Sequence, residues 1–165
     1  MASRYDIEDL LGDILALLQS KLNARIASIE AEKIAAGKPD TGLKPIDSSA
    51  YFEQSWSDKM LNITPAIFYG IEEDESVGAG PATVQTVTLW VDVVIVDSGM
   101  DNLTKNRILR YSRALREIFE ENWDAFIGNA SKIKIKTVRP IDFKMELNTS
   151  ETIKVGGVSI VTALG

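Results

Sequence analysis

The segment that decides the fold runs from Thr83 to Asp97 and reads TVQTVTLWVDVVIVD. Its odd-numbered positions from Val87 to Ile95 are all apolar, and side chains alternate between the two faces of a strand. At ~3.3 Å per residue this strand would span roughly 45 Å, whereas a usual strand has ~5–6 residues. The even-numbered positions mix polar and apolar types: Thr86, Thr88, Trp90, Asp92, Val94 and Val96. This pattern predicts that another subunit completes the surroundings of the strand.

The composition indicates one ordinary globular domain spanning residues 1–165. The chain is 45% hydrophobic and 25% charged, and no apolar run reaches the ~18 residues of a membrane span. The first residues lack the basic, then apolar, then small-residue order of a signal peptide. We therefore expect cytoplasmic synthesis and no contact with a membrane.

The chain contains neither histidine nor cysteine. This excludes the common zinc sites and every nucleophile relay that depends on those residues. The net charge of −6 also argues against a general nucleic-acid binder, although a local basic patch remains open. We expect no catalytic residue, no metal ligand and no cofactor.

Apolar residues at three- and four-residue spacing predict a long amphipathic helix from about Asp6 to Ala36. Asp6 or Ser3 can cap its start, and Gly37 with Pro39 ends it. The second half, from Ala24, has fewer large apolar residues, so we expect it to extend beyond the core.

A polar connection at 38–62 follows this helix, and its later part carries three aromatic residues, Tyr51, Phe52 and Trp56. Long connections without secondary structure are uncommon in compact domains. Two interpretations stay open, a loop that covers an edge of the core and a contact with a partner.

A short strand from Pro65 to Ile71 and the long strand form an antiparallel hairpin. Its tip, residues 72–82, begins with four acidic residues, Glu72, Glu73, Asp74 and Glu75. This run lacks the spaced ligands of a calcium loop, so a solvated tip is the simpler interpretation.

The second helix begins near Asp101, and one side of it carries basic residues followed by acidic ones. This order opposes the helix dipole, which favours acidic residues early and basic residues late. A solvated face explains it simply, whereas DNA or an acidic neighbouring subunit would give it a purpose. The basic residues are Lys105, Arg107, Arg110, Arg113 and Arg116.

After Gly128 the pattern returns to strands. One strand covers 132–138 and ends at Pro140, and residues 141–147 form a second strand or its continuation. The last strand covers 152–164, with a bulge or bend at Gly156 and Gly157.

These elements predict an α+β fold in which two helices pack on one face of a four- to five-stranded mixed, mainly antiparallel sheet, in α-β-β-α-β-β order. The opposite face is then left without a cover from this chain. That face includes Trp90, Asp92, Val94 and Val96.

A magnesium-dependent nuclease is the best enzymatic alternative, with Asp92 set beside Asp142 and Lys144 on an adjacent strand. The same residues also fit ordinary outward-facing strand charges, because an Asp-x-Lys triplet arises easily by chance. We therefore expect a protein that is not an enzyme.

The chain resembles the tail terminator proteins of long-tailed bacteriophages. The resemblance is carried by the leading helix, the Pro65–Ile71 strand, the long strand, the helix segment LTKNRILRYSRALR at 103–116 and the closing strand GGVSIVTAL at 156–164. The resemblance is one of architecture and covers most of the chain. It implies a structural virion protein, assembled in the host cytoplasm, that forms a ring, typically a hexamer. Such a ring caps the tail tube, stops its polymerisation and joins the tail to the neck. A head-completion or neck adaptor and a tail tube or sheath protein are the alternatives.

The resemblance also implies partners and contact residues. The partners are other copies of the chain, the tail tube protein, the neck or connector protein, and DNA that passes through the channel. The acidic tip at 72–75 would contact tube or neck, and the basic helix residues would line the channel or meet a neighbouring subunit. The expected subunit contacts are Trp90, Asp92, Val94, Val96 and Trp56.

Overall fold

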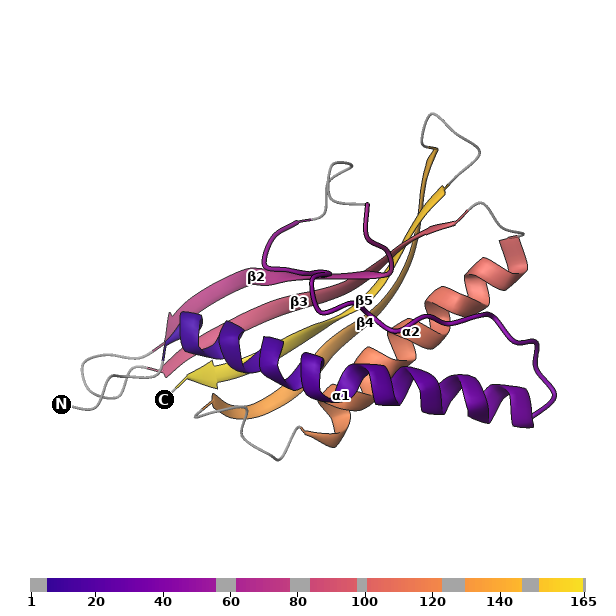
Figure 1. Cartoon of the computed structure of the whole chain (residues 1–165). Helices are drawn as coiled ribbons and strands as arrows, with labels where there is room; N and C mark the ends of the chain where they lie inside the picture. The colour runs from indigo at the N-terminus through magenta and orange to yellow at the C-terminus, as the bar shows by residue number, and fades with distance from the viewer. Residues whose placement is uncertain are drawn as a thin grey trace.

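A computed structural model describes residues 6–55, 62–77, 84–97, 101–122, 130–146 and 152–164. Within these ranges the chain forms two helices and a five-stranded sheet (Figure 1). The elements are α1 (Ile7–Ala35), β1 (Tyr51–Phe52), β2 (Ala66–Val77), β3 (Val84–Asp97), α2 (Asp101–Glu121), β4 (Ala130–Glu146) and β5 (Thr152–Leu164). Neither helix has the length and apolarity that crossing a membrane requires, as far as the described residues extend.

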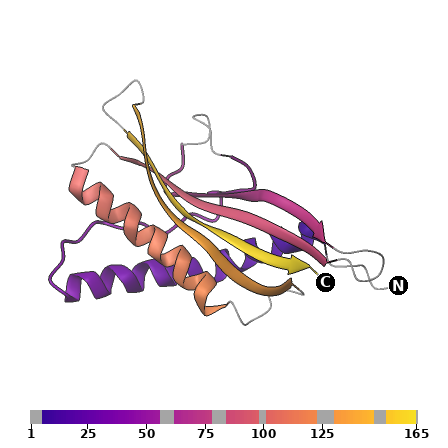
Figure 2. The ribbon, with the colours of Figure 1, turned by 180° about the vertical axis from the view of Figure 1, so that it is seen from behind.

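The strand order in the sheet is β1-β2-β3-β5-β4. The short β1 runs parallel to β2, and the other three pairings are antiparallel. Both helices lie on the same face of the sheet, with α2 packed over β3, β4 and β5 (Figures 1 and 2). The predicted α+β fold, with two helices on one face of a mainly antiparallel sheet, is confirmed.

Helix α1 begins with a capping box. The Asp6 carboxylate accepts a hydrogen bond from the Asp9 backbone N–H (3.1 Å), and the Asp9 carboxylate accepts one from the Asp6 N–H (3.0 Å). Of the two predicted caps, Asp6 is therefore the one used. The prediction that the second half of α1 extends beyond the core is confirmed only for its last turn, where Ile34 is 45% exposed, because Ile26 and Ile29 are buried.

The odd-numbered face of β3 builds the core, as predicted. Val87, Leu89, Val91, Val93 and Ile95 are all buried. Residues directly opposite each other in an antiparallel pair share a face, and Val93 lies opposite Gly156 of β5. A Cβ atom at Gly156 would lie 2.2 Å from the Ser112 hydroxyl of α2, so the odd-numbered face of β3 is the one that the helices cover.

The connection after α1 is held to both helices and then joins the sheet. The Asn23 side chain accepts a hydrogen bond from the Ile46 N–H (2.7 Å) and donates one to the Ile46 carbonyl (2.9 Å). The Tyr111 hydroxyl of α2 bonds the Lys44 backbone in the same two ways, at 2.9 and 2.8 Å. The described part of this connection therefore covers an edge of the core, one of the two interpretations left open. Trp56 lies outside the described residues.

The end of β2 and the form of β5 differ from the prediction, and β4 decides between two alternatives that the sequence left open. Strand β2 continues to Val77, so the acidic run lies within a strand and not at a hairpin tip. Strand β4 passes through Pro140 without a break, so the residues after Pro140 continue the same strand, one of the two alternatives left open; an edge strand tolerates the proline because one side of its backbone has no partner within the described sheet. Strand β5 pairs with β3 from Thr152 to Leu164 without a register shift, so the two glycines at 156–157 form no bulge against β3.

Candidate assembly surface

The outer face is the face of the sheet that lies away from the helices. Strand β3 presents its even-numbered residues there, as the pairing of Asp92 with Gly157 shows: a Cβ atom at Gly157 would lie 2.2 Å from the Asp92 carboxylate. The predicted contact residues Trp90, Asp92 and Val96 are all partly exposed on this face. Four of the five predicted subunit contacts thus lie on β3, and three of them are partly exposed.

Trp90 lies over the neighbouring strand β2. It is directly opposite Gly70, and a Cβ atom at that glycine would be only 3.0 Å from Cζ2 of the indole. On its other side Trp90 is opposite Ser159 of β5, whose hydroxyl donates a hydrogen bond to the Glu72 carboxylate (2.9 Å). The ring is therefore held in position by the chain itself while part of it stays exposed.

Asp92 lies between an aromatic residue and a glycine. Phe68 is opposite it on β2 and is fully buried, with its ring stacked on Phe52 of β1 at a centroid distance of 5.0 Å. Gly157 is opposite it on β5, where any larger side chain would collide with the carboxylate. Glycine inside a strand often marks such a close approach, and that signal in the sequence could have identified Gly70 and Gly157 as part of this surface.

The prediction that this face has no cover from the chain is wrong at Val94. Val94, Ala66 on β2 and Val155 on β5 form a row across three strands, with exposed fractions of 0%, 0% and 4%. The sheet twists strongly along its length, as Figures 1 and 2 show, so the outer face is not a flat open surface. Val94 belongs to the core of this chain, and the partly exposed part of the face is centred on Trp90 and Asp92.

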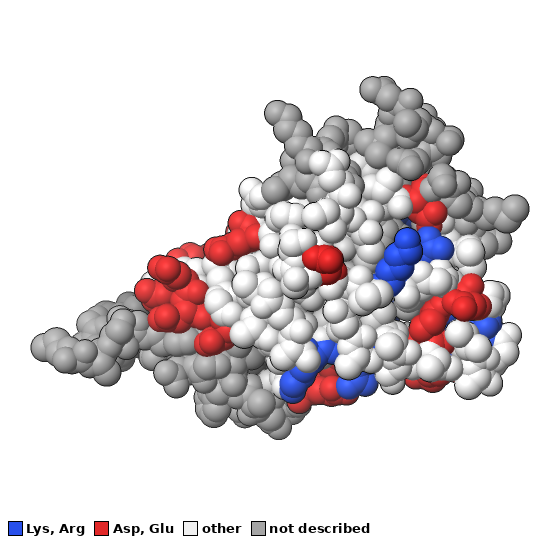
Figure 3. Space-filling view, viewed as in Figure 1, with Lys and Arg blue, Asp and Glu red and all other residues white. Residues whose placement is uncertain are grey.

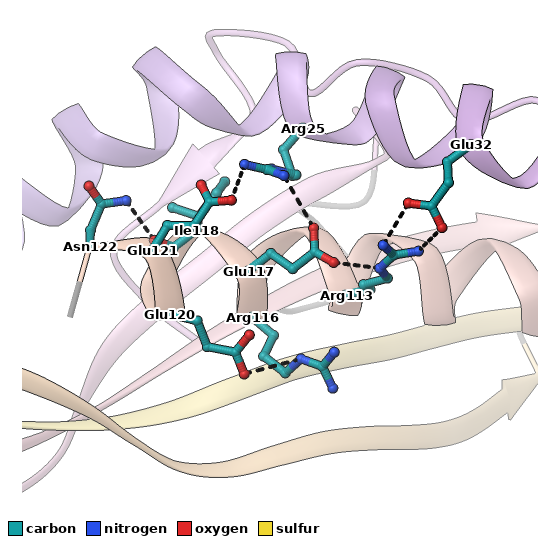
Figure 4. Close-up of polar contacts among 9 residues, drawn as sticks. All are labelled: Arg25, Glu32, Arg113, Arg116, Glu117, Ile118, Glu120, Glu121 and Asn122. Atoms are coloured by element: carbon teal, nitrogen blue, oxygen red, sulfur yellow. Dashed lines mark hydrogen bonds and ion pairs between the residues drawn. The ribbon is translucent and has the colours of Figure 1, made fainter.

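The basic residues of α2 face an acidic neighbour within the same chain. Arg110 donates to the Glu30 carboxylate of α1 (2.6 Å), and its side chain is only 6% exposed. Arg113 binds the Glu32 carboxylate (2.7 and 2.9 Å) and also Glu117 (2.5 Å), as Figure 4 shows for these side chains. Arg113 and its partners thus join the two helices.

The later, acidic part of α2 meets a basic residue of α1. Arg25 pairs with Glu121 and, at 3.4 Å, with Glu117 (Figure 4). The two helices run in opposite directions, so the order of charges along α2 complements the order along α1. This explains the arrangement that opposes the helix dipole. The complementary order of charges on the two predicted helices was the signal in the sequence that could have revealed this pairing of α1 with α2.

The remaining basic residues divide between internal pairs and solvent. Arg107 pairs with Asp97 at the end of β3 and donates to the Thr41 carbonyl (2.8 Å). Arg116 approaches Glu120 at 3.5 Å, and Lys105 is exposed. The structure therefore places Arg107 and Arg110 in contacts that hold the fold.

The pKa values of the acidic partners follow from these contacts. Burial raises the pKa of Glu30, but hydrogen bonds from Arg110 and from Thr41 outweigh it and lower the pKa to about 2. The hydrogen bond from Arg113 lowers the pKa of Glu32, which is far more exposed. The buried Arg110 is thus matched by a carboxylate that stays charged at neutral pH.

The residues of the nuclease alternative do not lie on adjacent strands. Asp92 is on β3 and Asp142 is on β4, and β5 lies between these strands. No group of three acidic residues within the described parts of the chain is arranged to hold a metal ion. The arrangement that this alternative requires is absent from the described sheet.

Comparison with known proteins gives little beyond the fold. No protein-family model matches the chain, and no curated protein matches its sequence. Eighteen chains of solved structures match. One belongs to the virion of a native gene transfer agent particle; it is 8% identical, the match covers 90% of this chain and 98% of that chain, and the TM-score is 0.40. A likeness at this level identifies neither a family nor a function.

Proposed function

We propose that this chain is a structural subunit of a phage-like virion that acts as a tail terminator. In this role copies of the chain form a closed ring, of hexameric type, on the end of the tail tube. The ring stops polymerisation of the tube and joins the tail to the neck, and the chain performs no catalysis.

The observation that carries this proposal is the difference in burial between the two faces of β3. One face is buried under the chain's own helices, while the other holds a tryptophan and an aspartate in fixed positions with part of each exposed. Tryptophan is among the residues that contribute most to binding at protein interfaces, above all where it is held rigidly before the partner arrives. The outer face at Trp90 is therefore a prepared contact site.

The architecture is the second support. The order of elements, the long β3 and the α2 segment at 103–116 are those on which the resemblance to tail terminators rests, and the structure has them as predicted. The ion pairs of α2 with α1 leave Lys105 and Arg116 as the basic residues of that helix with the most freedom to meet DNA or a neighbouring subunit.

Replacement of Trp90 by alanine tests the proposal. We expect Trp90→Ala to weaken ring assembly, measured by native mass spectrometry, more than it lowers the melting temperature of the protein. Phe68→Ala is the matched control, because Phe68 is on the same face but fully buried, and it should mainly lower the melting temperature. A large loss of melting temperature in Trp90→Ala with intact rings would show that Trp90 only stabilises the core.

A further inference from the structure

Within the described residues, the sheet has two open edges of very different length and charge. At one edge β1 pairs with only Ile67 and Phe68 of β2, so in the described parts of the chain nothing pairs with the outer side of β2 from Tyr69 to Val77. At the other edge lies β4, whose single partner in the described sheet is β5. An unpaired strand edge presents backbone donors and acceptors to any strand that can dock there.

The backbone of β2 shows which groups face that open edge. The Ile67 N–H donates outward to the Ala50 carbonyl (2.8 Å), on the side away from β3. Backbone groups alternate in direction along a strand, so Tyr69 and Ile71 direct theirs to the same open edge. The edge can therefore accept another strand beyond the point where β1 ends.

The two edge strands carry opposite charge. Strand β2 contains four acidic residues and no basic one, and Glu72, Asp74 and Glu75 are exposed. Acidic side chains gather at the end of the molecule where α1 begins and β2 ends (Figure 3). The sequence of β4 contains five basic and two acidic residues, in a chain whose net charge is −6. Like charges on facing strands are unfavourable, so neither edge suits a second copy of itself.

The directions of the strands permit the two edges to meet. Successive antiparallel pairings from β2 through β3 and β5 to β4 leave β2 and β4 running in opposite directions. If β4 of one copy continues the sheet beside β2 of the next, the new pair is therefore antiparallel. Such a contact joins two different surfaces of the chain. It closes into a ring when a whole number of the rotations that relate neighbouring copies adds up to one full turn.

We propose that the acidic edge of β2 in one copy pairs with the basic edge of β4 in a second copy, which extends the sheet from subunit to subunit. This joint rests on the proposed ring and adds a contact between strand edges to the contact proposed at Trp90. Opposite charges select the correct pairing, and backbone hydrogen bonds between the strands supply its geometry.

Reversal of charge on each edge tests the joint. The acidic-edge variant is Glu73→Lys, Asp74→Lys and Glu75→Lys, and the basic-edge variant is Lys132→Glu, Lys134→Glu and Lys136→Glu. A chain with all six changes keeps the net charge of the unmodified protein. Glu120→Lys, on α2, serves as a control for altered charge elsewhere. Oligomers are measured by native mass spectrometry and by sedimentation velocity, with circular dichroism to verify folding.

We expect each single-edge variant to weaken association about tenfold or more, because the two edges would then carry charge of the same sign. The six-residue variant should assemble again. An equimolar mixture of the two single-edge variants should also assemble, and only into rings with an even number of subunits, because the two chains must alternate. The helix control should assemble like the unmodified protein.

The outcomes separate this joint from the proposed function. Rings of unmodified protein that survive both single-edge changes would overturn the joint and leave the ring in place. Loss of rings without rescue in the mixture or the six-residue variant would overturn the charge pairing. An unmodified protein that stays monomeric, with and without tail tube protein, would overturn both.

Discussion

The Glu30–Arg110 pair allows the clearest test of what holds the helical layer together. The two side chains are 12% and 6% exposed, and Glu30 also accepts hydrogen bonds from the Thr41 N–H (2.6 Å) and hydroxyl (2.9 Å). The change Glu30→Gln would leave the buried guanidinium without its counter-charge. Breaking one side of a buried pair in this way costs about 3–5 kcal/mol.

The pKa of Glu30 gives a second route to the size of this effect. Its lowering from 4.5 to about 2 corresponds to roughly 3 kcal/mol, at about 1.4 kcal/mol per pKa unit. Because the pKa is lowered in the folded state, this stabilisation is present above pH ~4.5 and is lost as the pH falls towards 2. We therefore expect Glu30→Gln to reduce the free energy of unfolding by about 3 kcal/mol at pH 7, with a difference from the unmodified protein that shrinks between these pH values.

Glu32→Gln is the matched control, since Glu32 is also on α1 and also pairs with an arginine of α2. Its side chain is 55% exposed, so its removal should cost clearly less than the removal of the Glu30 charge. Urea unfolding of the three proteins, repeated from pH 7 down to pH 3, measures both effects. Equal costs for the two changes, or a Glu30→Gln cost that does not vary with pH, would refute the assignment of Glu30 as the buried counter-charge.

Two further changes test how the helical layer meets the sheet and the connection. Gly156→Val places a side chain where a Cβ atom alone would lie 2.2 Å from the Ser112 hydroxyl, so the melting temperature should fall by several degrees. A thermal denaturation curve that shows no change would contradict the close contact of α2 with β5. Asn23→Ala removes both hydrogen bonds to Ile46 and should reduce the free energy of unfolding, measured by urea unfolding, by about 1–3 kcal/mol. Hydrogen exchange that stays slow at the Ile46 N–H in this variant would show that other contacts hold the connection.

Local patterns in the sequence predicted the elements whose shape depends on their own residues. Both helices and the buried face of β3 follow from the spacing of apolar side chains, which depends only on the geometry of a helix or strand. The cap at Asp6, one of the two residues predicted for it, belongs to the same class, because the N–H that it binds is only three residues away. These features required no knowledge of the rest of the chain.

The errors concern elements that depend on distant partners. The acidic residues 72–75 have weak strand preference, yet they form part of β2 because Val84–Leu89 of β3 lies beside them. Strand β1 has two residues and no pattern of its own, so only its pairing with Ile67 and Phe68 reveals it. The partners of the α2 arginines also became clear only once α1 was known to run antiparallel beside them.

The order of charges along α1 and α2 also fixes where one helix can lie along the other. A slide of α1 by one turn, about 5.4 Å, would carry Glu30 away from Arg110 and leave a buried positive charge unpaired. The observed alignment of the two helices therefore pairs Arg110 with Glu30 and Arg113 with Glu32 at the same time. The connection from α1 to β1 is bound to α1 at Thr41 and at Ile46, so the segment that leads into β1 is held in place by the same helix. A change between the two helices would thus also act on this segment and, through it, on the part of the β2 edge that β1 covers.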